Sequence, residues 1–353
     1  MPEANHAIRL GIVGCGLASR RHHLPTLAAL PEFTVAAIAD TDPASLEEAA
    51  KRFGIPQRFS SHHEMLAGAD LDAVVVATPT SSHAEIGLDV LHARKHMFME
   101  KPLAMNLDEC DELMEASAAA QTRVLVAHNS RWHRLAVHAR EMIRSGLLGT
   151  VKAIRSVYTH AHDGSSAQPW HKVRALGGGV MFNDGVHHFD LWRYLLDTEV
   201  VQIQADSIDS THFEDDTCTV SARLANGALA SAVFSFSTSP NSEVEIFGES
   251  GSLLLSLYRF DGLSFTPHTA LPGSIATRIE QTKNFVQSLP AGLSALRRGG
   301  DFDATYDAMW RHYADCILRD ATPACTLSDG RASLAAALAC LDSASSGRPV
   351  RLG

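Results

Sequence analysis

Short apolar segments alternate with helical segments through the first third of this 353-residue chain. The apolar segments are continuous in Val, Ile, Ala, Leu and Met, which is typical of parallel strands that are buried on both faces. Because parallel strands need a crossover connection, usually a helix, this alternation predicts a doubly wound α/β sheet. The expected strands lie within residues 8–14, 33–40, 72–79, 96–102 and 123–129, and the expected helices include residues 43–54, 81–94 and 106–120.

The pattern changes after residue 129 to apolar residues at every second position. Period-2 alternation is typical of antiparallel strands with one covered face. Asn226-Gly227 separates two such runs and favours a two-residue hairpin turn. We therefore expect a second domain with a large, mostly antiparallel sheet and helices on one face. We expect its strands within residues 151–162, 200–210, 216–237 and 243–257, helices at about 275–289, 303–319 and 328–344, and a mobile surface loop over residues 289–307.

Composition excludes several classes of partner. A formal net charge of −10 argues against nucleic acid, whose phosphates need clustered Lys and Arg. No apolar run approaches the roughly 20 residues that cross a bilayer, and the start of the chain has no cleavable signal pattern. The six cysteines are dispersed, which fits a reducing compartment, and we expect a cytoplasmic location without a membrane partner. His160 and His162 form the nearest approach to a ligand pair, and no metal is expected.

A glycine turn follows the first expected strand. Gly14 and Gly16, with Leu17 beside them, open a helix, so backbone N–H groups can approach a pyrophosphate at the helix N-terminus. A plain tight turn would use the same glycines, and the motif alone leaves both interpretations open. The second expected strand, however, ends at Asp40, whose carboxylate can accept hydrogen bonds from the ribose of NAD and would repel the 2′-phosphate of NADP. Together these features predict NAD as cofactor in preference to NADP.

The segment "MEKPLA" places two charged residues at the end of a strand. Glu100 and Lys101 come at the carboxyl end of the strand expected within residues 96–102, the edge where ligands bind in open α/β sheets. Such a pair is ordinarily a surface salt bridge. At this edge, a lysine that reaches the nicotinamide can instead bond a substrate hydroxyl and stabilise the developing alkoxide.

The segment "GGGVMFNDGVHHFD" gathers titratable groups in front of an apolar helix. One interpretation is a loop in which Asn183 or Asp184 caps that helix. The other is a catalytic site in which His187, whose ordinary pKa is about 6.5, takes a proton from a substrate hydroxyl. Asp190, three residues further along the expected helix, would then help to orient His187.

These motifs, together with "ATPTSSHAEIGLDVLHARKHMFMEKPLA" and "RWHRLAVHAREMIRSGLLGTVKAI", occur in an order and spacing that resembles the glucose–fructose oxidoreductase/inositol dehydrogenase/rhizopine catabolism (Gfo/Idh/MocA) family. The resemblance covers essentially the whole chain. It implies an NAD-binding Rossmann domain over residues 1–129 and, over residues 130–353, an α/β domain for substrate binding and oligomerisation. It also implies hydride transfer between nicotinamide and a hydroxyl carbon of a sugar, cyclitol or sugar derivative.

The resemblance also implies roles for single residues. Lys101 and His187 match the catalytic lysine and histidine of the family, and Asn183 stands where many members have Asp, which marks a difference in substrate class. The cofactor-lining positions are Thr78, Pro79, His83 and Glu100, and those beside the nicotinamide and substrate are Asn129 and Arg131. Trp170 and Arg174 offer an aromatic and a cationic group to a sugar, although each can also be an ordinary loop residue.

Two other functions remain open within the same family. One is a redox-neutral glycosidase or lyase that uses tightly held NAD for transient oxidation, and the other is a non-catalytic ligand-sensing regulator. Retention of both Lys101 and His187 argues against the regulator. The second sheet also carries alternate apolar residues on a face that the terminal helices cannot fully cover, which predicts a homodimer or homotetramer.

Overall fold

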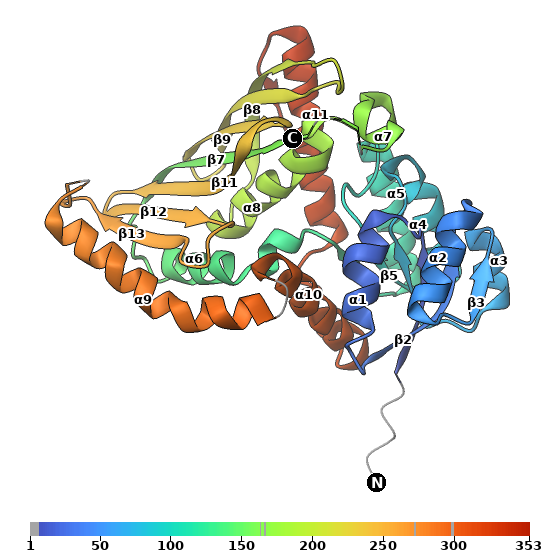
Figure 1. Cartoon of the computed structure of the whole chain (residues 1–353). Helices are drawn as coiled ribbons and strands as arrows, with labels where there is room; N and C mark the ends of the chain where they lie inside the picture. The colour runs from blue at the N-terminus through green and yellow to red at the C-terminus, as the bar shows by residue number, and fades with distance from the viewer. Residues whose placement is uncertain (1–6, 163, 166, 272, 298–299) are drawn as a thin grey trace. The chain divides into compact units, whose positions relative to one another are not determined.

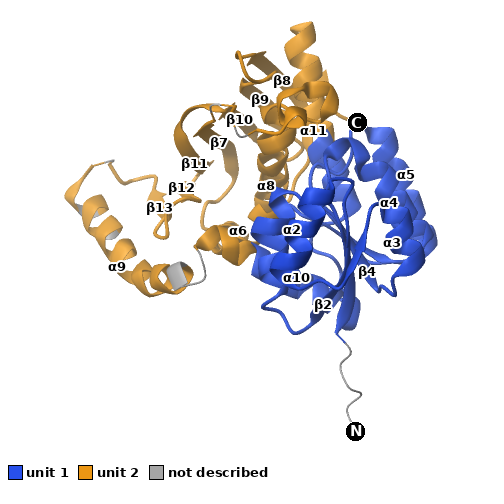
Figure 2. Ribbon diagram, turned by 45° about the vertical axis from the view of Figure 1, so that its right-hand side comes forward, with its two compact units in different colours: residues 1–128, 306–334 blue, residues 129–305, 335–353 orange. Residues whose placement is uncertain are grey.

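The computed structural model describes residues 7–162, 164–165, 167–271, 273–297 and 300–353. They form two compact units (Figure 2), one made of residues 1–128 and 306–334 and the other of residues 129–305 and 335–353. Residues 306–334, which the sequence analysis assigns to the second domain, are therefore grouped with the first unit. The roles assigned to the two domains stay predictions.

The first unit is built on a six-stranded sheet in which every neighbouring pair is parallel. Figure 1 labels its strands β2, β3 and β5. The central strand β1 is apolar and buried, with Leu10 and Ile12 at 0% exposure. This arrangement confirms the predicted doubly wound sheet. The strand order is β3 (Gln57–Phe59), β2 (Phe33–Ala39), β1 (Ile8–Val13), β4 (Ala73–Val76), β5 (His96–Met99) and β6 (Val124–Val126).

Helices connect these strands as the crossovers of a parallel sheet require. Asp42 caps α2, because its side chain accepts hydrogen bonds from the backbone N–H groups of Ala44 and Ser45. Strand β3 and helix α3 were not expected from the sequence. The connecting elements are η1 (Ser19–His23), α1 (Leu24–Leu27), α2 (Pro43–Phe53), α3 (His62–Gly68), η2 (Thr80–Ser82), α4 (His83–His92) and α5 (Leu107–Ala120).

The second unit contains an eight-stranded sheet in which only the β7–β10 pair is parallel among the described strands. The predicted large, mostly antiparallel sheet is thus confirmed. Residues 225–228 connect β9 to β10, so the expected hairpin is present but its connection is longer than the expected two residues; Gly227 has a φ of +88°. The order is β13 (Leu263–Pro267), β12 (Gly251–Ser256), β11 (Ser237–Gly248), β7 (Val151–Ala161), β10 (Leu229–Ser235), β9 (Thr217–Leu224), β8 (Val200–Ile208) and β14 (Val350–Arg351).

One face of this sheet forms the core of the second unit. Phe234 on β10 packs against Phe189 of helix α8 (Val186–Leu196), with ring centroids 5.8 Å apart. On the opposite face, Leu229, Val233 and Phe247 are exposed. The remaining helical elements of this unit include η3 (Asn129–Trp132), α6 (Arg134–Arg144), α7 (Pro169–Lys172), η4 (Arg174–Leu176), η5 (Met181–Gly185) and α9 (Ile275–Arg297).

The prediction of a loop over residues 289–307 is wrong for the part that the structure describes, because most of these residues are helical. Helix α9 continues through Pro290 to Arg297, and α10 (Asp301–Leu318) begins four residues later. Pro290 and the glycines suggested a break, but Gly292 lets the ring of Phe260 lie against the helix, where an added Cβ would be 2.7 Å from that ring. Tertiary packing here outweighs the local signal of Pro and Gly. The last helix is α11 (Leu327–Ser346).

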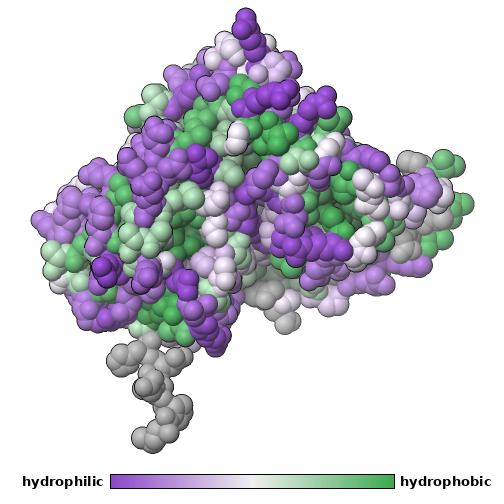
Figure 3. All heavy atoms as spheres, turned by 180° about the vertical axis from the view of Figure 1, so that it is seen from behind, coloured by the Kyte–Doolittle hydropathy of each residue, from purple (hydrophilic) through white to green (hydrophobic). Residues whose placement is uncertain are grey.

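The surface of the molecule mixes polar and apolar residues, as Figure 3 shows for one face. The described part of the chain contains no helix that is both long enough and apolar enough to cross a bilayer.

His188 makes the stability of the fold depend on pH. It is buried beside Tyr158 and Phe234, and this burial lowers its pKa to about 3. Below pH 6.5 the unfolded chain binds a proton at His188 that the native chain does not. The free energy of unfolding should therefore fall by about 1.4 kcal/mol per pH unit between pH 6.5 and 3 from this residue alone. His133, whose pKa burial lowers to about 4, acts in the same direction.

Melting curves between pH 7 and 4 test this expectation. The His188→Leu variant should lose less stability on acidification than the wild type. The matched variant His138→Leu, at an exposed position in the same unit, should keep the wild-type slope. Identical slopes for His188→Leu and the wild type would show that this residue does not control acid stability.

Candidate active site

The glycine turn has the shape that a pyrophosphate needs. Gly14 has a φ of +95°, and an added Cβ would lie 2.4 Å from the carbonyl oxygen of Ala77, so no other residue fits there. A Cβ at Gly16 would meet no atom within 4 Å, which leaves open space beside the backbone. Leu17 is exposed at the same turn, and the Ser19 hydroxyl donates to the Gly14 carbonyl at 2.5 Å.

Asp40 is held at this turn by two backbone groups. Its Oδ2 accepts the N–H of Cys15 at 2.6 Å, and its Oδ1 accepts the N–H of Asp42 at 2.8 Å. Each carboxylate oxygen has a second lone pair, so the group is fixed in place and can still accept hydrogen bonds from a ribose. The open turn and the oriented carboxylate together fit an NAD molecule.

The loop after β4 carries three of the predicted cofactor residues. The Ser82 hydroxyl bonds Thr78 Oγ1 and the Pro79 carbonyl, each at 2.9 Å, and so closes the loop on itself. The ring of His83 is buried, with Nδ1 2.8 Å from the Pro102 carbonyl and Nε2 2.9 Å from the Thr78 carbonyl. Burial lowers the pKa of His83 despite these two contacts.

Glu100 and Lys101 follow β5 at the same edge of the sheet. Glu100 is buried, and its Oε2 accepts the backbone N–H of Lys101 at 3.1 Å. Its Oε1 lies 2.9 Å from Nε2 of His23. Burial alone would raise the pKa of Glu100, but the hydrogen bond from His23 and the nearby charges hold it below its usual value. Glu100 is thus a buried anion, which the sequence interpretation as a surface ion pair with Lys101 did not foresee.

His187 lies in the first turn of α8 and is half-buried. The segment before it is the π-helical turn η5, which runs directly into α8, and neither Asn183 nor Asp184 caps the helix. The interpretation in which Asn183 or Asp184 caps the helix is therefore wrong. Asn183 instead donates from Nδ2 to the Gly179 carbonyl at 2.9 Å, as a continuous helix allows for residues four apart.

Asp184 has a partner that the sequence did not indicate. Its Oδ2 lies 3.1 Å from Nε2 of His160 on β7, and this hydrogen bond raises the pKa of His160. The ring of His160 lies 6.3 Å from that of His162, two residues further along the same segment.

Two residues predicted to lie beside the nicotinamide and the substrate make hydrogen bonds within the second unit. Arg131 on η3 donates from Nε and Nη2 to both oxygens of Asp190 on α8, at 2.7 and 2.6 Å, in a buried pair. Both oxygens of Asp190 thus accept hydrogen bonds from Arg131. If Asp190 also orients His187, as the sequence predicts, it does so while bound to Arg131. Asn129, at the start of η3, donates to the Thr305 hydroxyl at 3.2 Å.

Arg174 and Trp170 lie on the segment before η5. Arg174 forms a two-point ion pair with the buried Asp215, at 2.7 and 2.6 Å. Trp170 on α7 is half-buried and lies against the ring of His171, with centroids 3.7 Å apart. A substrate contact by Arg174 would have to share its guanidinium with Asp215.

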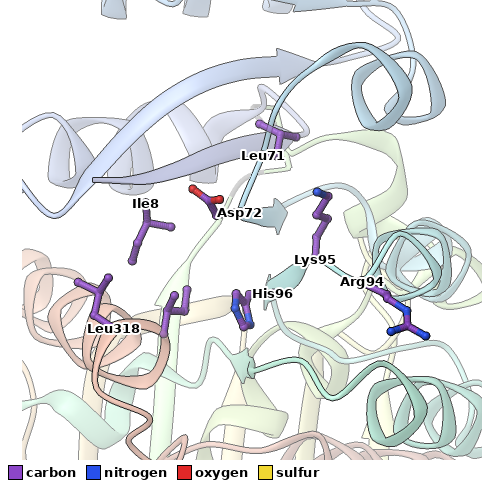
Figure 4. Close-up of a pocket in the computed structure, with 8 residues that line it drawn as sticks. Ile8, Leu71, Asp72, Arg94, Lys95, His96 and Leu318 are labelled. Carbon is purple, nitrogen blue, oxygen red and sulfur yellow. The ribbon is translucent and has the colours of Figure 1, made fainter. Parts of the chain in front are cut away.

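Two other features of the first unit lie outside these motifs. A pocket of about 430 Å³ is lined by residues such as Ile8, Asp72 and His96 (Figure 4), at the amino ends of β1, β4 and β5 and hence at the edge opposite to Lys101. Among the described residues, a possible metal-ligand group is formed by His62, His63 and Asp89, with ligand atoms within 4.8 Å of one another. Neither feature contributes to the predicted site.

The parallel sheet, the glycine turn and the oriented Asp40 define a dinucleotide-binding protein. Residues 8–128 match the oxidoreductase family with an NAD-binding Rossmann fold, and residues 136–254 match the GFO/IDH/MocA C-terminal domain. The two ranges cover more than half of the chain, in the predicted order. The chain belongs to the GFO/IDH/MocA family of oxidoreductases, and its cofactor is NAD, as the sequence predicted.

Relatives match over most of their length. The chain is 25% identical to the myo-inositol 2-dehydrogenase of Thermotoga maritima over 83% of this chain and 92% of the relative. It is 22% identical to the scyllo-inositol 2-dehydrogenase (NAD(+)) of Bacillus subtilis over 98% and 97%. The WlbA dehydrogenase from Bordetella pertussis, solved with NADH and UDP-GlcNAcA, has the same fold, with a TM-score of 0.84, 23% identity and coverage of 100% and 99%.

Asp40 should decide the preference for NAD over NADP. Calorimetric titration of the wild type should give tighter binding of NAD, because the carboxylate repels a 2′-phosphate. Asp40→Ala should weaken NAD binding by about tenfold or more and narrow the difference between the two cofactors. Asp40→Asn keeps the shape of the side chain but removes its charge, and it should also reduce the difference in affinity between NAD and NADP. Equal or tighter binding of NADP to the wild type would contradict this role.

Proposed function

We propose that this chain is an NAD-dependent dehydrogenase that acts on a CH–OH group of a sugar, cyclitol or sugar derivative. The observation that carries the proposal is the position of Lys101, which is held by Glu100 at the sheet edge that also bears the glycine turn and Asp40. The substrate class is supported by the relatives named for inositols and by the structure solved with a nucleotide sugar acid.

The chemistry divides between the cofactor and two side chains. Bound NAD accepts the hydrogen and electron pair that leave the alcohol carbon. Lys101 donates a hydrogen bond to the reacting oxygen and stabilises the negative charge that develops on it. His187 takes the hydroxyl proton as general base. Asn183 orients the substrate in place of the family's Asp.

The substrate contacts follow from the proposed reaction. Trp170 would offer an apolar ring face to a sugar, and Asn129 would contact the nicotinamide. Arg131 and Arg174 would each recognise an anionic or polar substituent while keeping their ion pairs with Asp190 and Asp215.

We also propose that the enzyme is a homodimer or homotetramer joined through the open face of the second sheet. Leu229 on β10 and Phe247 on β11 both lie opposite Ala153 of β7, so they share this exposed face. Apolar side chains gathered on one sheet face favour burial against a second copy.

The proposed activity is tested by a screen over sugars, cyclitols, uronates and nucleotide sugars with NAD, followed by NADH absorbance. Net NADH formation with one of these classes supports a dehydrogenase. Cleavage or elimination of the substrate without net NADH would support the redox-neutral function instead. Binding of a sugar without any reaction would support the regulator.

Lys101 and His187 should affect turnover and not folding. A general base contributes about 10²–10⁴ in rate, so His187→Asn should lower turnover by that factor while NAD still binds. Lys101→Ala should do likewise, and Lys101→Arg should not restore activity, because a planar guanidinium cannot replace a compact amine. The matched variants Lys51→Ala and His138→Ala, at exposed positions, should keep wild-type turnover.

Each variant must first show a wild-type melting transition, since loss of a buried polar group can destabilise the fold. A folded His187 or Lys101 variant that binds NAD and keeps more than about a tenth of wild-type turnover would remove that residue from the mechanism.

A further inference from the structure

Glu100 connects two segments of the first unit through its two carboxylate oxygens. Oε1 lies 2.9 Å from Nε2 of His23, and Oε2 accepts the backbone N–H of Lys101 at 3.1 Å. His23 is fully buried and Glu100 is 9% exposed. The backbone at Lys101 is thus tied to the segment η1, which directly follows the glycine turn.

Aromatic rings fix the orientation of His23. Phe98, Tyr306 and Trp310 meet its ring edge-on, with centroids 5.4, 5.4 and 5.7 Å away. Its Nδ1 is buried and has no hydrogen-bond partner among the described residues. A single N–H on Nε2, donated to Glu100, therefore satisfies the ring without burying an unused donor.

His83 holds the same loop from its other side. One ring nitrogen lies 2.8 Å from the Pro102 carbonyl and the other 2.9 Å from the Thr78 carbonyl. The residue is 1% exposed, so neither nitrogen is available to a ligand. This ring lies between the carbonyls of the loops after β4 and β5, one residue beyond Lys101, and a neutral ring donates its single N–H to one of the two.

We propose that His23 and His83 are positioning residues for Lys101. His23 acts through Glu100 on the backbone N–H of Lys101, and His83 acts on the carbonyl of Pro102. His23 belongs to η1, the segment that follows the glycine turn. The hydrogen bonds of Glu100 therefore connect this segment to the backbone of Lys101. The inference rests on the proposed role of Lys101, and it replaces a cofactor contact of His83 by a structural one.

Substitutions at His23 separate the hydrogen bond from the packing. His23→Leu removes the donor, and His23→Asn is too short to reach Glu100, whereas the amide of His23→Gln can take the place of Nε2. The first two should lower kcat by about 10- to 100-fold with little change in the Kd of NAD, because small displacements of a catalytic group are costly. His23→Gln should recover most of the wild-type rate. His83→Leu should resemble His23→Leu, and His83→Gln, which keeps one contact, should be intermediate.

Amide hydrogen exchange gives a readout that does not depend on activity. The N–H of Lys101 is the group that Glu100 holds, so His23→Leu and His23→Asn should speed its exchange by about tenfold, while His23→Gln restores slow exchange. The control is Phe33→Leu, which removes packing against Trp310, 5.3 Å away, and leaves Glu100 and its partners intact. It should lower the melting temperature but leave both the exchange at Lys101 and kcat near wild type.

The outcomes separate the two proposals. If a folded His23→Asn or His23→Leu variant shows wild-type exchange at Lys101 and wild-type kcat, the positioning role is overturned. It is also overturned if Phe33→Leu speeds exchange at Lys101 and lowers kcat as much as His23→Leu does. If the wild-type protein oxidises no alcohol, the proposed function fails. The exchange measurement would still decide whether His23 holds the backbone of Lys101.

Discussion

Parallel pairing of the strands in the first sheet places every loop that follows a strand at the same edge. The glycine turn follows β1, Asp40 follows β2, Thr78 follows β4 and Lys101 follows β5. Strands β2 and β4 pair with opposite sides of β1. The connections that follow β1 and the strands beside it therefore run in opposite directions along the sheet, and no crossover covers the loops after β1 and β4. The glycine turn and Lys101 thus share one edge of the sheet because of strand direction.

Buried carboxylates make hydrogen bonds that connect the segments carrying the predicted site residues. Glu100, Asp190 and Asp215 are each buried and each engaged by a histidine or an arginine. The buried Arg131–Asp190 pair adds little net stability, since desolvation of both charges offsets their attraction, but loss of one partner costs about 3–5 kcal/mol. All three contacts join segments that lie far apart in the chain. Arg131 joins η3 to α8, the helix of His187, and His23 joins η1 to the loop of Lys101.

Sequence patterns predicted the features of the fold that depend on local periodicity. Both sheets and the hairpin between β9 and β10 follow from residues close together in the chain. Strand β3 was missed because its residues are mostly exposed and carry no continuous apolar signal. The catalytic and binding roles given to the residues of the site motifs stay predictions. The hydrogen-bond partners of these residues were not predicted, because Arg131 and Asp190 are 59 residues apart and His23 and Glu100 are 77 apart.

The most direct test of the account is the fate of the hydrogen on the substrate's alcohol carbon. An alcohol found in the screen can be prepared with deuterium at that carbon and incubated with the enzyme and NAD, and the reduced cofactor then analysed by mass spectrometry. A dehydrogenase built around Lys101 and His187 should deliver the deuterium to the cofactor in proportion to the ketone or aldehyde formed. Product formation with an unlabelled reduced cofactor, or with no reduced cofactor at all, would contradict it.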